Sequence, residues 1–150
     1  MERLNWDTYF IELADLISKR STCRRQVGAV IVKDNLIIST GYNGSPKGLK
    51  HCSENGGCIR LLKNIKSGTQ QEICRAVHAE QNAIIQAAVK GDSIKDGTLY
   101  VNTYPCSICA RMIINAEIKK IVYNGEYEDD LAKELLEESN IEIVKYKKYL

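Results

Sequence analysis

Two short segments of this chain carry strong metal ligands and a carboxylate, and any fold of the chain has to bring them together. The first is His78-Ala79-Glu80, and the second is Pro105-Cys106-Ser107-Ile108-Cys109. One His and two Cys are good zinc ligands, and a site with three protein ligands leaves a fourth position open for water. Glu80 lies two residues from His78 and could carry the proton of that water. A metal, a water and a carboxylate together indicate a hydrolytic site.

Both segments are expected at the starts of helices. Apolar periodicity predicts a helix from Arg75 to Lys90, which Gly91 ends, and another from Cys106 to Ala116. Two cysteines three residues apart at a helix start share one face. The positive partial charge of a helix N-terminus also favours thiolate. Two helix starts that face each other at one end of a sheet would bring His78 to the cysteines.

Further elements follow from periodicity and turn signals. We expect helices over 4–18 and 129–139, and strands over 28–32, 36–40, 98–102, 120–123 and 141–145. Asp34-Asn35 is a tight-turn signal that predicts a hairpin of the first two strands. The latter half alternates helix and strand, which favours parallel pairing. The sequence therefore predicts an α/β fold with a mixed sheet of about five strands covered by helices.

Length and composition limit the possible classes of protein. A chain of 150 residues predicts a single domain over 1–150. The net charge of +2 gives no broad footprint for nucleic acid. The polar start lacks the apolar core of a signal peptide, and no apolar run approaches the length of a membrane span. We expect a cytoplasmic protein without a nucleic-acid or membrane partner.

The region of about 43–74 stands out as a cysteine-containing insert. Residues 43–70 are rich in Gly, Ser, Asn and Lys and have no long periodic stretch. A loop of that length in a compact domain is usually functional or disordered. The chain has 6 Cys, and in a cytoplasmic protein metal binding or catalysis explains such residues better than disulfides.

The two opening segments match the signature of zinc-dependent nucleobase deaminases. The whole chain resembles the deoxycytidylate (dCMP) deaminases, especially those of the bacterial type. The matching segments are Arg20-Ser21-Thr22-Cys23, Val27-Gly28-Ala29-Val30-Ile31, Gly41-Tyr42-Asn43-Gly44-Ser45-Pro46, His51-Cys52, Gly57-Cys58, Cys74-Arg75-Ala76-Val77-His78-Ala79-Glu80 and Asn82-Ala83-Ile84. This resemblance implies a cytidine-deaminase-like fold of three layers, α/β/α.

The resemblance implies hydrolysis of dCMP to dUMP and ammonia through attack of hydroxide on C4, in the supply of precursor for thymidylate. Zinc would be held by His78, Cys106 and Cys109, and Glu80 would shuttle protons. Asn43 would hydrogen-bond the deoxyribose, although Asn-Gly is also a strong turn signal. Ala79 and Tyr127 fall at positions where the family contacts substrate.

Some members of the family bind a second, structural zinc ion. Here the resemblance points to Cys23, Cys52 and Cys74 as ligands, with either Cys58 or His51 as the fourth. A closed site with four ligands would fix the insert, which has little apolar content. The alternative is a set of small buried residues, since free Cys is often buried.

Phosphate recognition is not specified by the sequence. Related phage enzymes place an Arg late in the His-Ala-Glu helix, whereas this chain has Ala88-Val89-Lys90 there. Other cationic candidates are Arg24, Arg25, Lys47 and Arg75. Each of them could equally be a solvated surface charge.

Regulation and assembly follow only from the resemblance. Many dCMP deaminases are homohexamers that dCTP activates and dTTP inhibits, and a triphosphate effector can bring Mg²⁺. The segment that helps form their effector site corresponds here to Gly41, Tyr42, Asn43 and Gly44. We expect an oligomer, a hexamer if it follows these relatives.

Two alternatives remain open. A tRNA adenosine deaminase or a free cytidine deaminase would share the metal motifs. The tRNA enzymes usually lack the cysteine-rich insert, and free cytidine deaminases usually lack a helix such as 129–139 between the last two strands. A non-catalytic, zinc-stabilised binding module would use the Cys and His residues in two closed sites, and the placement of Glu80 and an open metal position argue against it.

Overall fold

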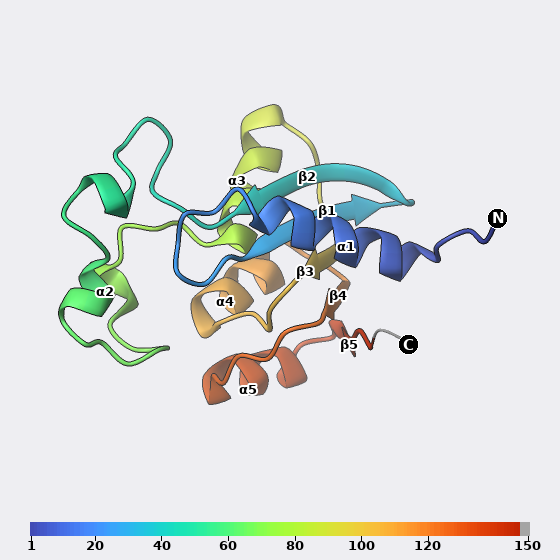
Figure 1. Cartoon of the computed structure of the whole chain (residues 1–150). Coiled ribbons are helices and arrows are strands. Elements are labelled where there is room, and N and C mark those ends of the chain that lie inside the picture. The colour runs from blue at the N-terminus through green and yellow to red at the C-terminus, as the bar shows by residue number, and fades with distance from the viewer. Residues whose placement is uncertain (148–150) are drawn as a thin grey trace.

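The computed structural model describes residues 1–147, which form a mixed sheet between layers of helices (Figure 1). The strands are β1 (Gly28–Lys33), β2 (Leu36–Tyr42), β3 (Thr98–Val101), β4 (Lys120–Tyr123) and β5 (Glu142–Lys145). The order in the 5-stranded sheet is β2-β1-β3-β4-β5. β1 pairs antiparallel with β2 and β3, while β3, β4 and β5 are parallel to one another. The predicted mixed sheet is confirmed.

Helices cover both faces of the sheet. On one face, α1 (Trp6–Ser18) packs Phe10, Ile11 and Ala14 against apolar side chains of β1, β3 and β4. On the other face lie α3 (Ala79–Lys90), α4 (Ser107–Asn115) and α5 (Asp130–Glu138). The two sets of buried residues give the predicted three layers.

The β1–β2 hairpin has the turn that its sequence predicts. Asp34 and Asn35 have φ values of 52° and 59°. Positive φ at both central residues is typical of the type I′ turn, which matches the twist of the paired strands. β2 is an edge strand of the sheet.

The start of α3 corrects the predicted helix over 75–90. The helix begins at Ala79, and His78 is its N-cap with extended backbone (φ −72°, ψ 157°). Val77 exchanges two backbone hydrogen bonds with Gly44, of 2.8 and 3.1 Å, which keeps the chain extended before the cap. Long-range pairing, which no local sequence pattern shows, determines the backbone there.

Smaller differences in bounds come from capping. Asn5 caps α1 through a hydrogen bond from the backbone N–H of Thr8, so that helix begins at Trp6 and not at Leu4. Cys106 and Asp129 are N-caps, and α4 and α5 begin one residue later than predicted. Each predicted strand and helix is otherwise present within a few residues.

The insert forms an irregular lobe at one end of the sheet, at the left of Figure 1. It contains α2 (Ile59–Leu62) and two short 3₁₀ helices, η1 (Cys52–Glu54) and η2 (Gln71–Ile73). Arg60 fastens the loop before η2 by donating to the carbonyl oxygens of Lys66 at 2.8 Å and Gln70 at 3.0 Å. No helix within residues 1–147 has the length and apolar character of a membrane span.

Candidate active site

The three predicted metal ligands meet between the starts of α3 and α4. The Nδ1 atom of His78 lies 3.4 Å from the Sγ atom of Cys106 and 3.4 Å from that of Cys109. The ligand atoms all lie within 4.8 Å of one another. Both cysteines are buried and His78 is partly buried. The prediction that two helix starts bring the motifs together is confirmed.

These distances fit a tetrahedral zinc ion. With zinc–sulfur and zinc–nitrogen bonds of ordinary length, neighbouring ligand atoms of a tetrahedron lie roughly 3.5–3.8 Å apart. The His-to-Cys distances of 3.4 Å are close to that spacing. One imidazole and two thiolates would leave a fourth position free, as in catalytic zinc sites.

The surroundings of the two thiols shift their pKa values in opposite directions. A hydrogen bond from Cys109 and another with His78 lower the pKa of Cys106 to about 4. The same contact with Cys106, together with burial, raises the pKa of Cys109. The hydrogen bond to Cys106 also raises the pKa of His78. A lowered pKa favours the thiolate form of Cys106, which is the form that binds a metal cation.

Glu80 lies beside the ligands and away from solvent. Its side chain is 3% exposed, and its Oε2 atom lies 3.6 Å from the Sγ atom of Cys109. Burial raises the pKa of this carboxyl group, as is expected where the charged form loses water. A raised pKa makes the carboxyl group a better proton acceptor, which suits a group that takes up and returns protons.

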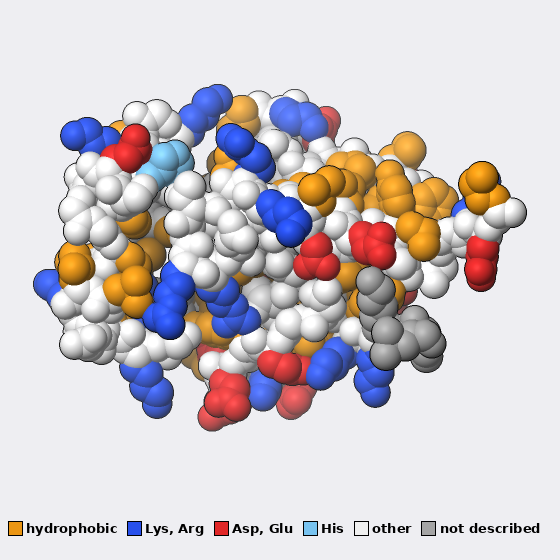
Figure 2. Space-filling model, in the orientation of Figure 1, with side chains coloured by type: hydrophobic (Ala, Val, Ile, Leu, Met, Phe, Trp, Pro, Cys, Tyr) orange, Lys and Arg blue, Asp and Glu red, His pale blue; other side chains and the backbone are white. Residues whose placement is uncertain are grey.

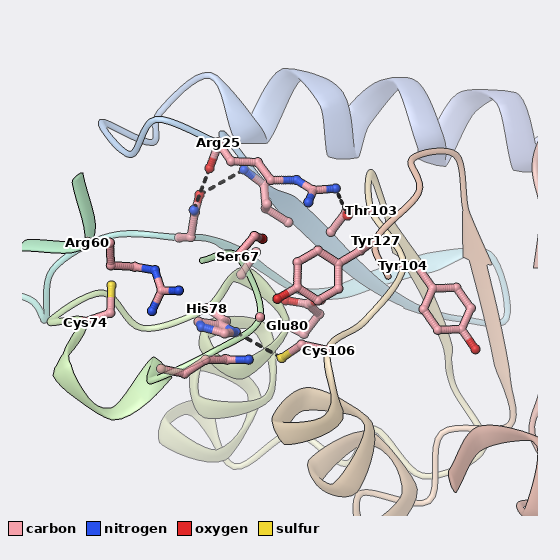
Figure 3. Close-up of a pocket in the computed structure, with 15 residues that line it drawn as sticks. Arg25, Arg60, Ser67, Cys74, His78, Glu80, Thr103, Tyr104, Cys106 and Tyr127 are labelled. Carbon is pink, nitrogen blue, oxygen red and sulfur yellow. Dashed lines mark hydrogen bonds between the residues drawn. The ribbon is translucent and has the colours of Figure 1, made fainter. Parts of the chain in front are cut away.

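A pocket of about 190 Å³ opens over these groups (Figure 3). Its lining comes from the β1 region, the insert, the start of α3, and the segments that follow β3 and β4. The lining residues are Arg25, Val27, Asn43, Arg60, Ser67, Gly68, Gln71, Cys74, His78, Ala79, Glu80, Thr103, Tyr104, Cys106 and Tyr127. The predicted substrate residues Asn43, Ala79 and Tyr127 are all among them.

The side chain of Asn43 forms hydrogen bonds with two backbone groups and also lines the pocket. Its Oδ1 atom accepts from the N–H of Val27 at 2.9 Å, and its Nδ2 atom donates to the carbonyl oxygen of Arg25 at 2.8 Å. Each atom of the amide can still make a further hydrogen bond. Ala79 is the first residue of α3, and N–H groups of a first helical turn have no acceptor within the helix.

Tyr127 lines the pocket and contacts Arg25. The Cζ atom of Arg25 lies 5.1 Å from the centre of the Tyr127 ring, within the range of a cation–π contact. Arg25 also donates to Thr103 Oγ1 at 2.5 Å and to the carbonyl oxygen of Glu126 at 2.6 Å. Figure 3 shows the Tyr127 ring close to Glu80 and Cys106.

The cationic residues that could bind a phosphate group fall into two sets, those that line the pocket and those that do not. Arg25 and Arg60 line the pocket, and Figure 3 shows them reaching it from different segments. Lys90 instead donates to the carbonyl oxygen of Ile38 and pairs with Asp92. Arg24, Lys47 and Arg75 are not among the lining residues. Sequence reasoning missed Arg60 and Gln71, because no local pattern in the insert predicts which of its side chains turn inward.

The insert cysteines are free thiols and partly buried. Burial is the main cause that raises the pKa of Cys23. Smaller contributions in the same direction come from Cys74, Cys52 and Cys58. These four do not form a ligand cluster as close as that of His78, Cys106 and Cys109 in the part of the chain that the structure describes. The side chain of His51 instead lies 3.4 Å from Thr22 Oγ1.

Curated proteins similar in sequence to this chain include deoxycytidylate deaminases of a yeast and of a phage. A deoxycytidylate deaminase of Schizosaccharomyces pombe is 38% identical over 96% of this chain, which spans only 45% of that protein. A deoxycytidylate deaminase of Mycobacterium phage D29 is 38% identical, over 84% of this chain and 99% of its own length. The chain thus spans less than half of the yeast relative and nearly all of the phage one.

A solved structure gives the same fold. The crystal structure of dCMP deaminase from the cyanophage S-TIM5, in complex with dCMP and dUMP, superposes with a TM-score of 0.78. The two proteins are 29% identical, over 97% of this chain and 100% of the phage chain. The predicted cytidine-deaminase-like fold is confirmed.

The family model for the cytidine and deoxycytidylate deaminase zinc-binding region matches residues 4–124. That stretch contains both metal motifs, Glu80 and the insert. Since the match extends over most of the chain and agrees with the geometry of the pocket, the chain belongs to the cytidine and deoxycytidylate deaminase family.

Proposed function

We propose that this protein is a zinc-dependent enzyme that hydrolyses dCMP to dUMP and ammonia. The observation that carries the proposal is a buried carboxylate, Glu80, beside a His/Cys/Cys cluster at the base of a pocket. The relatives named deoxycytidylate deaminase support this choice of substrate, as does the cyanophage complex with dCMP and dUMP.

Each group of the cluster has a role in this reaction. His78, Cys106 and Cys109 would hold the zinc ion. Bound zinc supplies a nucleophile at neutral pH, because it lowers the pKa of water from about 15.7 to about 7. Glu80, the carboxylate in reach, would carry two protons in turn. It would pass the first from water to the ring nitrogen, and the second from the new hydroxyl group at C4 to the leaving amine.

The polar groups around the cluster suit a nucleotide. We assign Asn43 to the deoxyribose, the N–H of Ala79 to the pyrimidine and Tyr127 to a contact with the base. The Oε1 atom of Gln71 is buried at the pocket without a partner among the described residues, and could accept from substrate. An unpaired buried acceptor costs about 1–3 kcal/mol, so a ligand that donates to it gains affinity.

We assign the 5′-phosphate to Arg25 and Arg60. They are the cationic side chains among the pocket-lining residues, and guanidinium groups bind phosphate through several donors at once. Each keeps N–H groups beyond those used in its contacts with the backbone and Thr103.

A second zinc ion in the insert is part of the proposal. Cys23, Cys52 and Cys74 would bind it, with Cys58 or His51 as the fourth ligand. The influence of Cys74, Cys52 and Cys58 on the pKa of Cys23 supports this set. Metal analysis of Cys52→Ser should find one zinc fewer per chain than in the unaltered protein. An unchanged zinc content would remove the second site.

Regulation and assembly stay proposals. We propose a homohexamer that dCTP, bound with Mg²⁺, activates and dTTP inhibits, with Gly41, Tyr42, Asn43 and Gly44 near the effector. Asn43 lines the catalytic pocket, so an effector beside this segment would lie next to the substrate. A sigmoidal rate curve for dCMP that dCTP makes hyperbolic would support coupling between two sites. Identical curves with and without either nucleotide would remove it.

We place the activity in the cytoplasm, where it would supply dUMP for thymidylate synthesis. The cysteines of the structure are free thiols, as is usual in a reducing compartment. On the face seen in Figure 2, basic and acidic side chains are interspersed, which does not favour tRNA as a substrate. The helix α5 between β4 and β5 argues against a free cytidine deaminase.

A comparison of five candidate substrates tests the proposal. Zinc-loaded protein is offered dCMP, CMP, deoxycytidine, dCTP and tRNA separately, and ammonia release is measured. We expect dCMP to be converted with the highest kcat/KM by a wide margin. If tRNA or a free nucleoside were converted faster than dCMP, that compound would be the substrate and the assignment of dCMP would be wrong. No ammonia from any substrate would favour the binding-module alternative.

A further inference from the structure

The helix that carries both cysteine ligands lacks a cap of its own. The N-cap residue of a helix usually accepts a hydrogen bond from an N–H of the first turn through its side chain. The N-cap of α4 is Cys106, whose side chain makes no such bond and faces His78 instead, at 3.4 Å. The first turn of α4 therefore needs an acceptor from elsewhere in the fold.

Asp129 provides that acceptor from the next helix. Its Oδ2 atom accepts the backbone N–H of Ser107, the first residue of α4, at 2.8 Å. Its Oδ1 atom accepts the N–H of Ala132 at 3.0 Å and so caps α5. One carboxylate thus caps two helices. Partial burial acts to raise the pKa of Asp129, but these backbone hydrogen bonds outweigh it and leave the pKa below its ordinary value.

The bond to Ser107 acts on the peptide unit that follows Cys106. We propose that Asp129 is a positioning residue that fixes the start of α4, and with it the two cysteine ligands, in the geometry that the metal requires. The proposal assumes that His78, Cys106 and Cys109 bind a metal ion and is independent of the substrate. Polar groups behind metal ligands commonly affect metal affinity by about 10–100-fold.

Two substitutions separate this role from the capping of α5. In Asp129→Asn, one amide oxygen can still cap α5, because Asn is as good an N-cap as Asp. The Nδ2 group of Asn is a donor and cannot accept from Ser107. In Asp129→Ser, the hydroxyl can cap α5 but is too short to reach α4. Asp130→Asn is the matched control, because it removes the same charge from an exposed neighbour.

The measurement uses Co²⁺ as the probe and no substrate. Binding of Co²⁺ is titrated by its d–d absorption bands, whose position reports the coordination geometry, and melting of the apo-protein is followed in parallel. Co²⁺ bound by the insert cysteines contributes equally to each variant, so difference spectra against Asp130→Asn isolate the site at α4.

We expect Asp129→Asn and Asp129→Ser to bind Co²⁺ about tenfold more weakly than the control, with shifted d–d bands. The Tm of each apo-protein should fall by only a few degrees, because one helix cap is lost while the fold is kept. Should either folded variant match the control in both affinity and band position, Asp129 only caps α5 and the proposal is wrong.

Discussion

Glu80 is the one carboxylate among the residues that line the pocket. Its burial and its distance of 3.6 Å from Cys109 place it beside the metal ligands. The lining also holds two guanidinium groups, those of Arg25 and Arg60. At the residue scale, this arrangement is the basis for proposing that Glu80 transfers protons and that the two guanidinium groups bind an anionic part of the substrate.

Arg60→Gln should reduce kcat/KM for dCMP by about 10–100-fold, because a hydrogen bond to a charged group contributes about 1.5–3 kcal/mol. The loss for deoxycytidine, which has no phosphate, should be much smaller. The ratio of the two rates is the relevant measurement, since Arg60 also fastens the loop at Lys66 and Gln70. Lys47→Gln, an exposed site, is the control. Equal losses with both substrates would contradict the assignment.

At the scale of elements, close contact between β2 and α3 sets the position of α3, which begins directly after His78 and carries Glu80. A Cβ atom on Gly41 would lie 2.2 Å from the carbonyl oxygen of Ala79 and 2.5 Å from the N atom of Ala83. Only glycine permits this approach without a backbone shift. The same contact brings β2 against the turn of α3 that carries Glu80.

Gly41→Ala should therefore lower both stability and activity. Overpacking of this kind costs about 1–3 kcal/mol, and displacement of the start of α3 would move Glu80 relative to the cysteines. Gly44→Ala is the control, because a Cβ atom there meets nothing within 4 Å. Chemical denaturation and rate measurements on both variants check this. A Gly41→Ala protein as stable and active as Gly44→Ala would contradict the packing argument.

The sequence predicts elements best where the local pattern decides them. The alternation from β3 to β5 is clear because apolar strands and amphipathic helices follow one another with short connections. The start of α3 is predicted wrongly, since Val77 pairs with Gly44, more than thirty residues earlier in the chain. Caps such as Asp129 also act across elements, and no local window shows the bond to Ser107.

For the whole molecule, the pocket lies where ligands of α/β sheets usually bind, beyond the carboxyl ends of parallel strands. Thr103, Tyr104 and Cys106 follow β3, and Tyr127 follows β4. The metal motifs were predictable because their ligand types and spacing carry the chemistry directly. The contribution of the insert, especially Arg60, depends on how an irregular segment folds over the site.

On the face of the sheet that α1 covers, Tyr100 should make the stability of the protein depend on pH. Burial, together with a hydrogen bond of 2.8 Å to Asp7, raises the pKa of Tyr100 above the ordinary value of 10.0. The unfolded chain therefore releases this proton at lower pH than the folded one. The stabilisation is complete below about pH 10 and is lost as the pH rises further.

Tyr100→Phe should make the fall in unfolding free energy above about pH 10 shallower. Urea denaturation at a series of pH values measures this, with Tyr9→Phe, at an exposed tyrosine, as the control. The same alkaline slope in Tyr100→Phe and in the control would show that Tyr100 is not the responsible group.

The most direct test of the central claim is the rate of dUMP formation from dCMP by Glu80→Gln, measured together with its zinc content. Gln has nearly the shape of Glu but cannot transfer the proton. We expect the zinc content to stay at that of the unaltered protein while the rate falls by about 10²–10⁴-fold. Glu134→Gln, on the exposed side of α5, should keep full activity. A zinc-loaded Glu80→Gln protein with more than about a tenth of the original rate would contradict the account.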